Sequence, residues 1–241
     1  MNALNRHPLD NPAWHALTTQ QETLALGGTL ARRYPVDVAP FAGVRNKTQD
    51  AFHELATLIP EGGFVVMQTL APLPPMDGIH HDIVFSVVQM VEASEAGAVS
   101  AVDAANSANR IDDEGIVRLA AGDVADMVAL TQRTHPGPFG KRTIETGNYL
   151  GLRVDGELVA MAGERMRLDG YAEISAVCVD ERHRGKGLAA RLMTLLRQQI
   201  KARGQTPFLH VKDDNAAAIA LYERLGFEAR QTFVMHRIAH A

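Results

Sequence analysis

The sequence contains a single cysteine, Cys178, among its 241 residues. One thiol cannot form an intrachain disulfide, and a zinc cluster that needs several cysteines is not expected. The first residues lack the unbroken apolar run of a secretory signal, and no stretch approaches the ~20 apolar residues that span a bilayer. These absences favour a cytoplasmic protein with no membrane partner.

Excess positive charge is also missing. The formal net charge is −4, so no overall field draws the chain to nucleic acid or to an anionic membrane. We expect no nucleic-acid partner, and any site for an anion must be local. Hydrophobic residues make up 46% of the chain and charged residues 22%, a balance that supports a sizeable core.

Large apolar residues are nearly absent between Val91 and Glu114, which indicates a linker or a weakly packed helical connector. We divide the chain into an N-terminal half at 1–92, a linker at 93–114 and a C-terminal half at 115–241. The first half is expected to be a smaller α+β unit without a catalytic motif. Its expected elements are helices at 17–30 and 51–58, an irregular strand at 34–44, and strands at 63–68 and 83–91.

The second half shows a clearer order of elements. Asp155-Gly156 and Asp169-Gly170 are hairpin signals between runs of alternating apolar residues. The pattern β-α-loop-β-β-β-α-β-α-β from Ile116 to Ile238 predicts an α/β fold with a mixed sheet and helices on both faces. The later elements are a strand at 171–179, a helix at 188–202 ending before Gly204, a strand at 206–212, a helix capped by Asn215, and a last strand at 233–238.

The segment VDERHRGKGLAARL, residues 179–192, combines basic side chains and glycines in a turn before a helix. Arg182, Arg184 and Lys186 supply positive charge, while Gly185 and Gly187 let a ligand approach the backbone. The first turn of a helix also presents N–H groups without intrahelical partners. Together these features predict a site for a phosphate or pyrophosphate.

Two nucleotide motifs do not fit this turn. A P-loop requires Ser or Thr after the lysine, but Gly187 follows Lys186. A dinucleotide-binding turn follows its strand directly and has an acidic residue about 20 positions later. Here the charged run DERHR intervenes, and position 205 is a glutamine.

The pattern Arg182-x-x-Gly185-x-Gly187 after an apolar strand, followed by NAAAIALYERLGF, resembles the GNAT superfamily of acyl-CoA N-acyltransferases. The resemblance covers about residues 115–238. HPGPFG and GLRVDGELVAMAGERM further resemble a branch related to glycine N-acyltransferases, in which an N-terminal half precedes the acyl-CoA domain. The first half is then interpreted either as a smaller α+β unit or as a degenerate copy of the same fold.

The resemblance implies where acetyl-CoA, the default donor, would bind. The strand residues 172–179 would splay from residues 208–212, and pantetheine would enter between them. Backbone groups at Val177, Cys178 and Val179 would bond the pantetheine, and Asn215 could contact it besides capping its helix. The pyrophosphate would bind the N–H groups of the turn, and Arg182 belongs to the same motif. These N–H groups are those of Arg184, Gly185, Lys186, Gly187 and Leu188.

Catalysis would require a proton donor and a proton acceptor, and no metal. In the family, the tyrosine that matches Tyr222 serves as general acid toward the thioester sulfur, and several members use a glutamate at the place of Glu173 as base. His210 on the neighbouring strand is the competing base. Alternation places Glu173, Ser175 and Val177 on one face of their strand. Each group also has a purely structural interpretation. Tyr222 could be a packing residue, Glu173 an exposed carboxylate, and His210 a hydrogen-bonded histidine within its strand.

The sequence thus predicts transfer of an acetyl group from acetyl-CoA to a primary amine of a small molecule or peptide, by direct attack in a ternary complex. The alternative is a non-catalytic acyl-CoA sensor or interaction module. Cys178 is expected in the core, and Glu164, Arg165 and Arg167 at the surface. The chain could act alone or as a homodimer, and the acceptor stays open.

Overall fold

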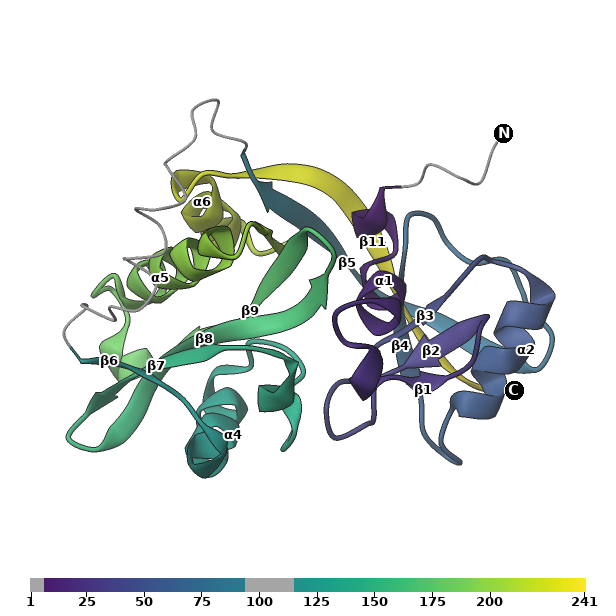
Figure 1. Cartoon of the computed structure of the whole chain (residues 1–241), viewed down its shortest axis with the longest axis horizontal. Helices are drawn as coiled ribbons and strands as arrows, with labels where there is room; N and C mark the ends of the chain where they lie inside the picture. The colour runs from purple at the N-terminus through teal and green to yellow at the C-terminus, as the bar shows by residue number, and fades with distance from the viewer. Residues whose placement is uncertain (1–6, 94–114) are drawn as a thin grey trace.

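The computed structural model describes residues 7–93 and 115–241. An eight-stranded sheet runs through both halves of these residues in the order β4-β11-β5-β10-β9-β8-β7-β6 (Figure 1). A second, three-stranded sheet, β1-β2-β3, lies in the first half. None of the described helices is long and apolar enough to cross a membrane.

The second half has the predicted order of elements, which confirms the mixed α/β fold. Its hairpin at Asp155-Gly156 has both residues at positive φ, 50° and 85°, as a two-residue turn of this kind requires. Its strands are β6 (Ile116–Arg118), β7 (Tyr149–Val154), β8 (Glu157–Leu168), β9 (Tyr171–Val179), β10 (Thr206–Lys212) and β11 (Phe227–His240). Its helices are α4 (Val124–Thr134), α5 (Leu188–Ala202) and α6 (Ala216–Arg224), with 3-10 turns at Ala121–Asp123, Thr143–Thr146 and Glu181–His183.

The first half departs more from expectation. The expected helix at 17–30 is wrong, because α1 (Pro12–Thr18) begins earlier and ends there. Two hydroxyl groups accompany its end, since Thr18 Oγ1 donates to the carbonyl of Trp14 (2.8 Å) and Thr19 Oγ1 to that of His15 (2.6 Å). The expected helix at 51–58 is confirmed. The other elements are β1 (Leu26–Gly27), β2 (Ala31–Arg33), β3 (Ala42–Val44), α2 (Gln49–Leu58), β4 (Val65–Thr69), β5 (Ile79–Glu92), and 3-10 turns at Pro8–Asp10 and Glu22–Leu24.

The two halves share their main sheet. β5 pairs antiparallel with β10 on one side and with β11 on the other, and β4 continues the sheet beyond β11. The expectation of a first half that only packs against the second therefore differs from the structure, because local sequence patterns identify strands but not their partners. Most of the expected linker, from residue 94 to 114, lies outside the described residues.

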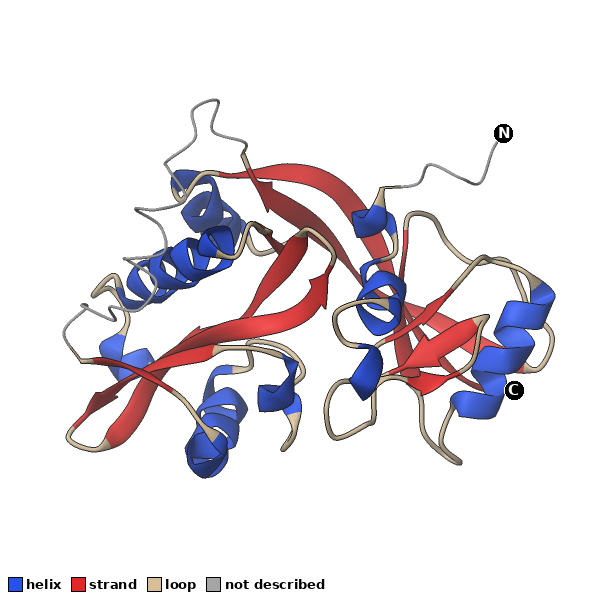
Figure 2. Ribbon diagram, in the orientation of Figure 1, coloured by secondary structure: helices blue, strands red, loops and turns tan. Residues whose placement is uncertain are grey.

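The faces of the sheet are covered by different helices. α5 and α6 lie on one side of β8 and β9, and α4 lies on the other (Figure 2). Leu192, Leu196 and Ile200 of α5 are fully buried against β8, β9 and β10. α1 belongs to a further cluster that joins the two halves and includes Phe208 and Phe233. The first residues of β9 and β10 are therefore packed between helices from both halves of the chain.

Candidate active site

β9 and β10 begin side by side and then part. Their parallel pairing runs only from Thr206↔Tyr171 to Phe208↔Glu173. Beyond this point β10 stays paired with β5, up to Lys212↔Val87. The carboxyl-terminal stretch of β9 is therefore unpaired on its β10 side, which is the arrangement that a strand-like ligand between them requires.

A β-bulge lies in the unpaired part of β9. Cys178 pairs with Met161 and Ser175 with Gly163, so β9 advances three residues where β8 advances two. Ala176 takes up the difference in the left-handed region, at φ 53°. A non-glycine residue in this region is uncommon and is tolerated only where its surroundings impose it.

The bulge reverses which side chains face which core. Ile174 packs in the α5 cluster, but Ala176 and Cys178 pack in the α4 cluster, while Val177 and Val179 turn to the α5 side. The predicted alternation is therefore right up to Ser175 and wrong from Ala176 onward. Cys178 lies in the core as expected, and burial raises the pKa of its thiol to about 11.

The basic turn is fixed at its start by Asp180. Its Oδ1 accepts hydrogen bonds from the N–H of Arg182 (3.1 Å) and from Arg182 Nε (2.9 Å). Arg182 Nη2 also donates to Glu157 (2.8 Å). These bonds from Arg182 hold the pKa of Asp180 well below its usual range. Arg182 therefore shapes the turn, and the exposed Arg184 and Lys186 carry the charge available to a ligand.

The glycines of the turn leave room for a ligand. Gly185 and Gly187 have φ of 76° and 73°, and a Cβ built on either would meet no atom within 4 Å. Gly187 is also the N-cap of α5, and Leu188, the first helical residue, is buried. The first helical turn thus begins beside open space in a basic setting, and its N–H groups lack intrahelical partners, as an anion site requires.

Tyr222 lies on α6, whose start is capped as predicted. Asn215 Oδ1 accepts from the N–H of Ala218 (3.1 Å). The Tyr222 ring packs against the α5 cluster and meets Phe227 edge-on at 6.4 Å. Burial raises the pKa of its hydroxyl to about 12, and no residue in the described ranges bonds that hydroxyl. The hydroxyl carries its proton at neutral pH, as that of an ordinary tyrosine does.

Glu173 is fully buried in an ion pair where β9 and β10 part. Its two carboxylate oxygens accept from Arg165 Nε (3.0 Å) and Arg165 Nη2 (2.6 Å). His210 Nδ1 lies 2.7 Å from the same carboxylate, across the gap between the strands. Because Glu173 belongs to the last residue pair of the two strands, these bonds clamp the point where they separate.

The pairing weakens the case for Glu173 as the base. Burial raises the pKa of Glu173, but Arg165 and His210 outweigh it and bring it to about 2. A carboxylate with so low a pKa accepts a proton poorly at neutral pH. His210 is no freer, since Gln89 Nε2 lies 3.1 Å from its Nε2 and its side chain is 3% exposed. The geometry thus favours a positioning role for both.

Arg165 is the residue that sequence analysis missed. The expectation of a surface position is wrong for Glu164 and Arg165, which are 0% and 9% exposed, and Arg167 is half-buried. Arg165 lies over the Phe41 ring at 4.6 Å, under the first half of the chain. Its burial thus depends on a segment over 100 positions away, which no local pattern shows.

The Glu173 ion pair predicts acid sensitivity. Its folded pKa of about 2 lies below the ordinary 4.5, so its stabilisation is complete above the unfolded value and is lost as pH falls through the folded one. We expect the free energy of unfolding to fall by about 3 kcal/mol between pH 5 and pH 2 from this group alone. Urea unfolding at stepped pH measures it, and a Glu173→Gln chain with the same pH dependence contradicts it.

Comparisons with known proteins agree with this geometry. Residues 149–235 match the family model described as FR47-like protein. A putative acetyltransferase of the GNAT family from Novosphingobium aromaticivorans is 35% identical, with a TM-score of 0.85 over 98% of this chain and 100% of that one. A GCN5-related N-acetyltransferase from Kribbella flavida, 18% identical, has the same fold, with a TM-score of 0.61 over 94% of this chain and 95% of that one.

Curated relatives match the second half. The [ribosomal protein bS18]-alanine N-acetyltransferase of Escherichia coli is 33% identical over 118 residues, 46% of this chain and 79% of that protein. The mycothiol acetyltransferase of Streptomyces avermitilis is 31% identical over 111 residues, 45% of this chain. The match spans about a third of that protein's length (36%). The chain belongs to the GNAT family of N-acyltransferases, whereas the glycine N-acyltransferase branch stays a prediction.

Proposed function

We propose that this chain transfers an acetyl group from acetyl-CoA to a primary amine of a small molecule or peptide, in the cytoplasm. The observation that carries the proposal is the open glycine turn at the start of α5, at the end of the strand edge that β10 leaves unpaired. A phosphate-bearing ligand with a long amide arm matches both parts. The amine attacks the thioester directly, and the thiolate leaves.

The residues present fit acetyl-CoA. The N–H groups from Arg184 to Leu188 meet the pyrophosphate, with Arg184 and Lys186 adding charge. Backbone groups of Val177, Cys178 and Val179, just past the bulge, bond the pantetheine, and Asn215 borders it. A backbone N–H freed by the bulge can polarise the thioester carbonyl as an oxyanion donor does.

Tyr222 is proposed as the general acid that protonates the leaving thiolate. Its hydroxyl is protonated at neutral pH, as that of an ordinary tyrosine is, although burial raises its pKa to about 12 and makes it a weaker acid. Glu173 enters the proposal as the group that, with His210, fixes the point where β9 and β10 part. The acceptor then loses its ammonium proton to water, which is consistent with an amine that attacks in its neutral form.

Tyr222→Phe is expected to lower kcat by about 100-fold or more, since a positioned general acid contributes at least that much. The Kd for CoA should change less than about twofold, because the ring and its packing remain. Thiol release from acetyl-CoA gives kcat, and calorimetry gives Kd. An unchanged kcat makes Tyr222 a packing residue and contradicts its proposed role.

The second candidate function is an acyl-CoA sensor. Binding of acetyl-CoA without thiol release, across small amines and alanine-starting peptides, distinguishes it from the enzyme. The availability of the Tyr222 hydroxyl favours the enzyme, since a sensor has no need of a proton donor at the thioester.

A further inference from the structure

A buried glutamine of the first half reaches the point where β9 and β10 part. Gln89 on β5 is fully buried, and its Nε2 lies 3.1 Å from His210 Nε2. His210 Nδ1 in turn lies 2.7 Å from Glu173, across the start of the gap between the two strands. Gln89 is thus connected, through the His210 ring, to the carboxylate of the last residue pair of β9 and β10.

Two neighbours fix the orientation of the Gln89 amide. Gln89 Nε2 donates to the carbonyl of Leu9 (3.0 Å), which can only accept. Gln89 Oε1 accepts from Arg230 Nη1 (2.9 Å), which can only donate. Exchanging the amide oxygen and nitrogen would place oxygen against oxygen and N–H against N–H. The atom that faces His210 is therefore the amide nitrogen.

The amide in turn fixes the tautomer of the His210 ring. The Gln89 nitrogen can only donate, so His210 Nε2 is the acceptor of their bond. The proton of the neutral ring then lies on Nδ1, which donates to Glu173 Oε1. A second proton, on Nε2, would meet the N–H of Gln89. Both ring nitrogens are thus occupied, and the ring adds no charge beside the ion pair of Glu173 with Arg165.

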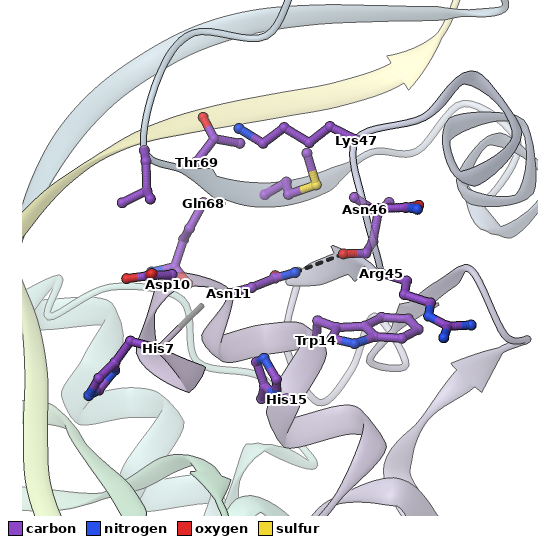
Figure 3. A pocket seen from close by; sticks show the side chains of 13 residues that line it. His7, Asp10, Asn11, Trp14, His15, Arg45, Asn46, Lys47, Gln68 and Thr69 are labelled. Carbon is purple, nitrogen blue, oxygen red and sulfur yellow. Dashed lines mark hydrogen bonds between the residues drawn. The ribbon is translucent and has the colours of Figure 1, made fainter. Parts of the chain in front are cut away.

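The ring and the amide are both held from outside. The Phe208 and Phe233 rings stand nearly perpendicular to the His210 ring, with centroids at 5.7 and 5.8 Å. Arg230, the donor to the amide, also donates from Nη2 to Asp10 (2.6 Å). Asp10 borders a cavity of about 300 Å³ beside α1 (Figure 3). The series of bonds therefore runs inward from a partly exposed ion pair to the buried ring.

We propose that Gln89 is a positioning residue of the acyl-transfer site, supplied by the first half of the chain. It holds His210 as the neutral Nδ1–H tautomer and so maintains the bond to Glu173 across the start of the gap that pantetheine is proposed to enter. This role rests on the proposed transfer reaction and deepens it, because it gives the first half a part in the geometry of the site.

Loss of this bond should change the rate more than the binding of acetyl-CoA. The groups proposed to hold acetyl-CoA are the turn at 182–188 and the backbone of 177–179, which lie on other elements than Gln89. The separation point of β9 and β10 instead positions the thioester. A displacement of about 1 Å at a reacting group can lower the rate by up to about 100-fold.

NMR of ¹⁵N-labelled histidine tests the tautomer directly. A long-range ¹H–¹⁵N spectrum at neutral pH distinguishes a ring nitrogen with a proton from one with a lone pair. The chain has 10 histidines, and His210 is the ring missing from the spectrum of His210→Asn. We expect a proton on Nδ1 and none on Nε2. A protonated Nε2 in the unmodified chain overturns the proposal.

Gln89→Glu reverses the expected spectrum. The new carboxylate has nearly the shape of the amide but can only accept, so a proton should appear on His210 Nε2. If the ring nitrogens of His210 are the same in this variant as in the unmodified chain, Gln89 does not fix the tautomer and the proposal is wrong.

Gln89→Met removes the donor and should lower kcat by about tenfold or more, with the Kd for acetyl-CoA changed by less than about twofold. Gln21→Met is the matched control, because Gln21 is also a buried glutamine of the first half and donates to two backbone carbonyls of the second. Within the described part of the chain it bonds neither His210 nor Glu173. Its kcat should change by less than about threefold even though stability falls. Equal losses of kcat would make Gln89 a purely structural residue.

His210→Asn provides the rescue. The side-chain nitrogen of asparagine is bonded to Cγ, as His210 Nδ1 is, and it donates to Glu173 without a tautomer to be fixed. In this background Gln89→Met should lower kcat by less than about threefold. An equal loss in both backgrounds shows that Gln89 does not act through His210, which contradicts the proposal.

The proposed function and the role of Gln89 can fail separately. A chain that binds acetyl-CoA but releases no thiol with any amine contradicts the proposed function. The ring-nitrogen spectra need no turnover, so they still decide whether Gln89 holds His210 in the Nδ1–H form.

Discussion

Gly187→Glu is expected to weaken CoA binding by at least about 100-fold. The new carboxylate would stand at the start of α5, where the pyrophosphate is proposed to bind, and like charges at an interface cost several kcal/mol. No atom lies within 4 Å of the position that its Cβ would occupy, so the core is not disturbed. The CoA-dependent rise in Tm should therefore disappear.

A matched control separates this effect from backbone strain. Gly170→Glu adds the same side chain at a positive φ of 79° in equally open space, but at the hairpin between β8 and β9. Both variants should lose similar stability without ligand, about 1 kcal/mol from the left-handed conformation. If Gly187→Glu binds CoA as tightly as Gly170→Glu does, the turn is not the phosphate site.

Glu173→Gln is expected to lower the free energy of unfolding by about 3–5 kcal/mol, because it leaves the buried Arg165 without a countercharge. Both side chains are enclosed, with Glu173 at 0% and Arg165 at 9% exposure. A typical domain is stable by only about 5–15 kcal/mol, so this single change removes a large share. Urea unfolding at neutral pH measures the loss.

The double variant Glu173→Leu with Arg165→Met tests whether the lost stability comes from the unpaired charge of Arg165. Removing both charges should restore much of the stability, since replacing a buried ion pair by apolar residues is often close to neutral. If the double variant is also stable but loses its catalytic rate by orders of magnitude with CoA binding intact, Glu173 acts on the substrate after all. If the catalytic rate is restored together with the free energy of unfolding, Glu173 has a positioning role.

Much of the second half could be predicted from the sequence because its signals are local. Asp155-Gly156 needs only two positive φ angles, and Asn215 caps the helix that follows it by accepting from the N–H three residues later. The basic turn is likewise read within one segment, 179–192. Each of these depends on neighbours along the chain, so no knowledge of the tertiary fold is required.

The rest depends on contacts between distant segments. The bulge at Ala176 exchanges the faces of β9, and nothing in YAEISAVCV marks the extra residue. Arg165 is buried because Phe41 covers it and Glu173 pairs with it. β5 lies between β10 and β11, whose residues follow their β5 partners by over 100 positions. The same long-range packing favours Glu173 as a residue that fixes the separation point of β9 and β10, and not as the general base.

Calorimetric titration of the unmodified chain with acetyl-CoA tests the central claim most directly. The structure predicts saturable binding of one acetyl-CoA per chain, through the turn at 182–188 and the unpaired edge of β9. Thiol release on adding a primary amine would then follow from the same complex. A chain that binds neither acetyl-CoA nor CoA contradicts the account, and its GNAT fold would then serve a role other than acyl transfer.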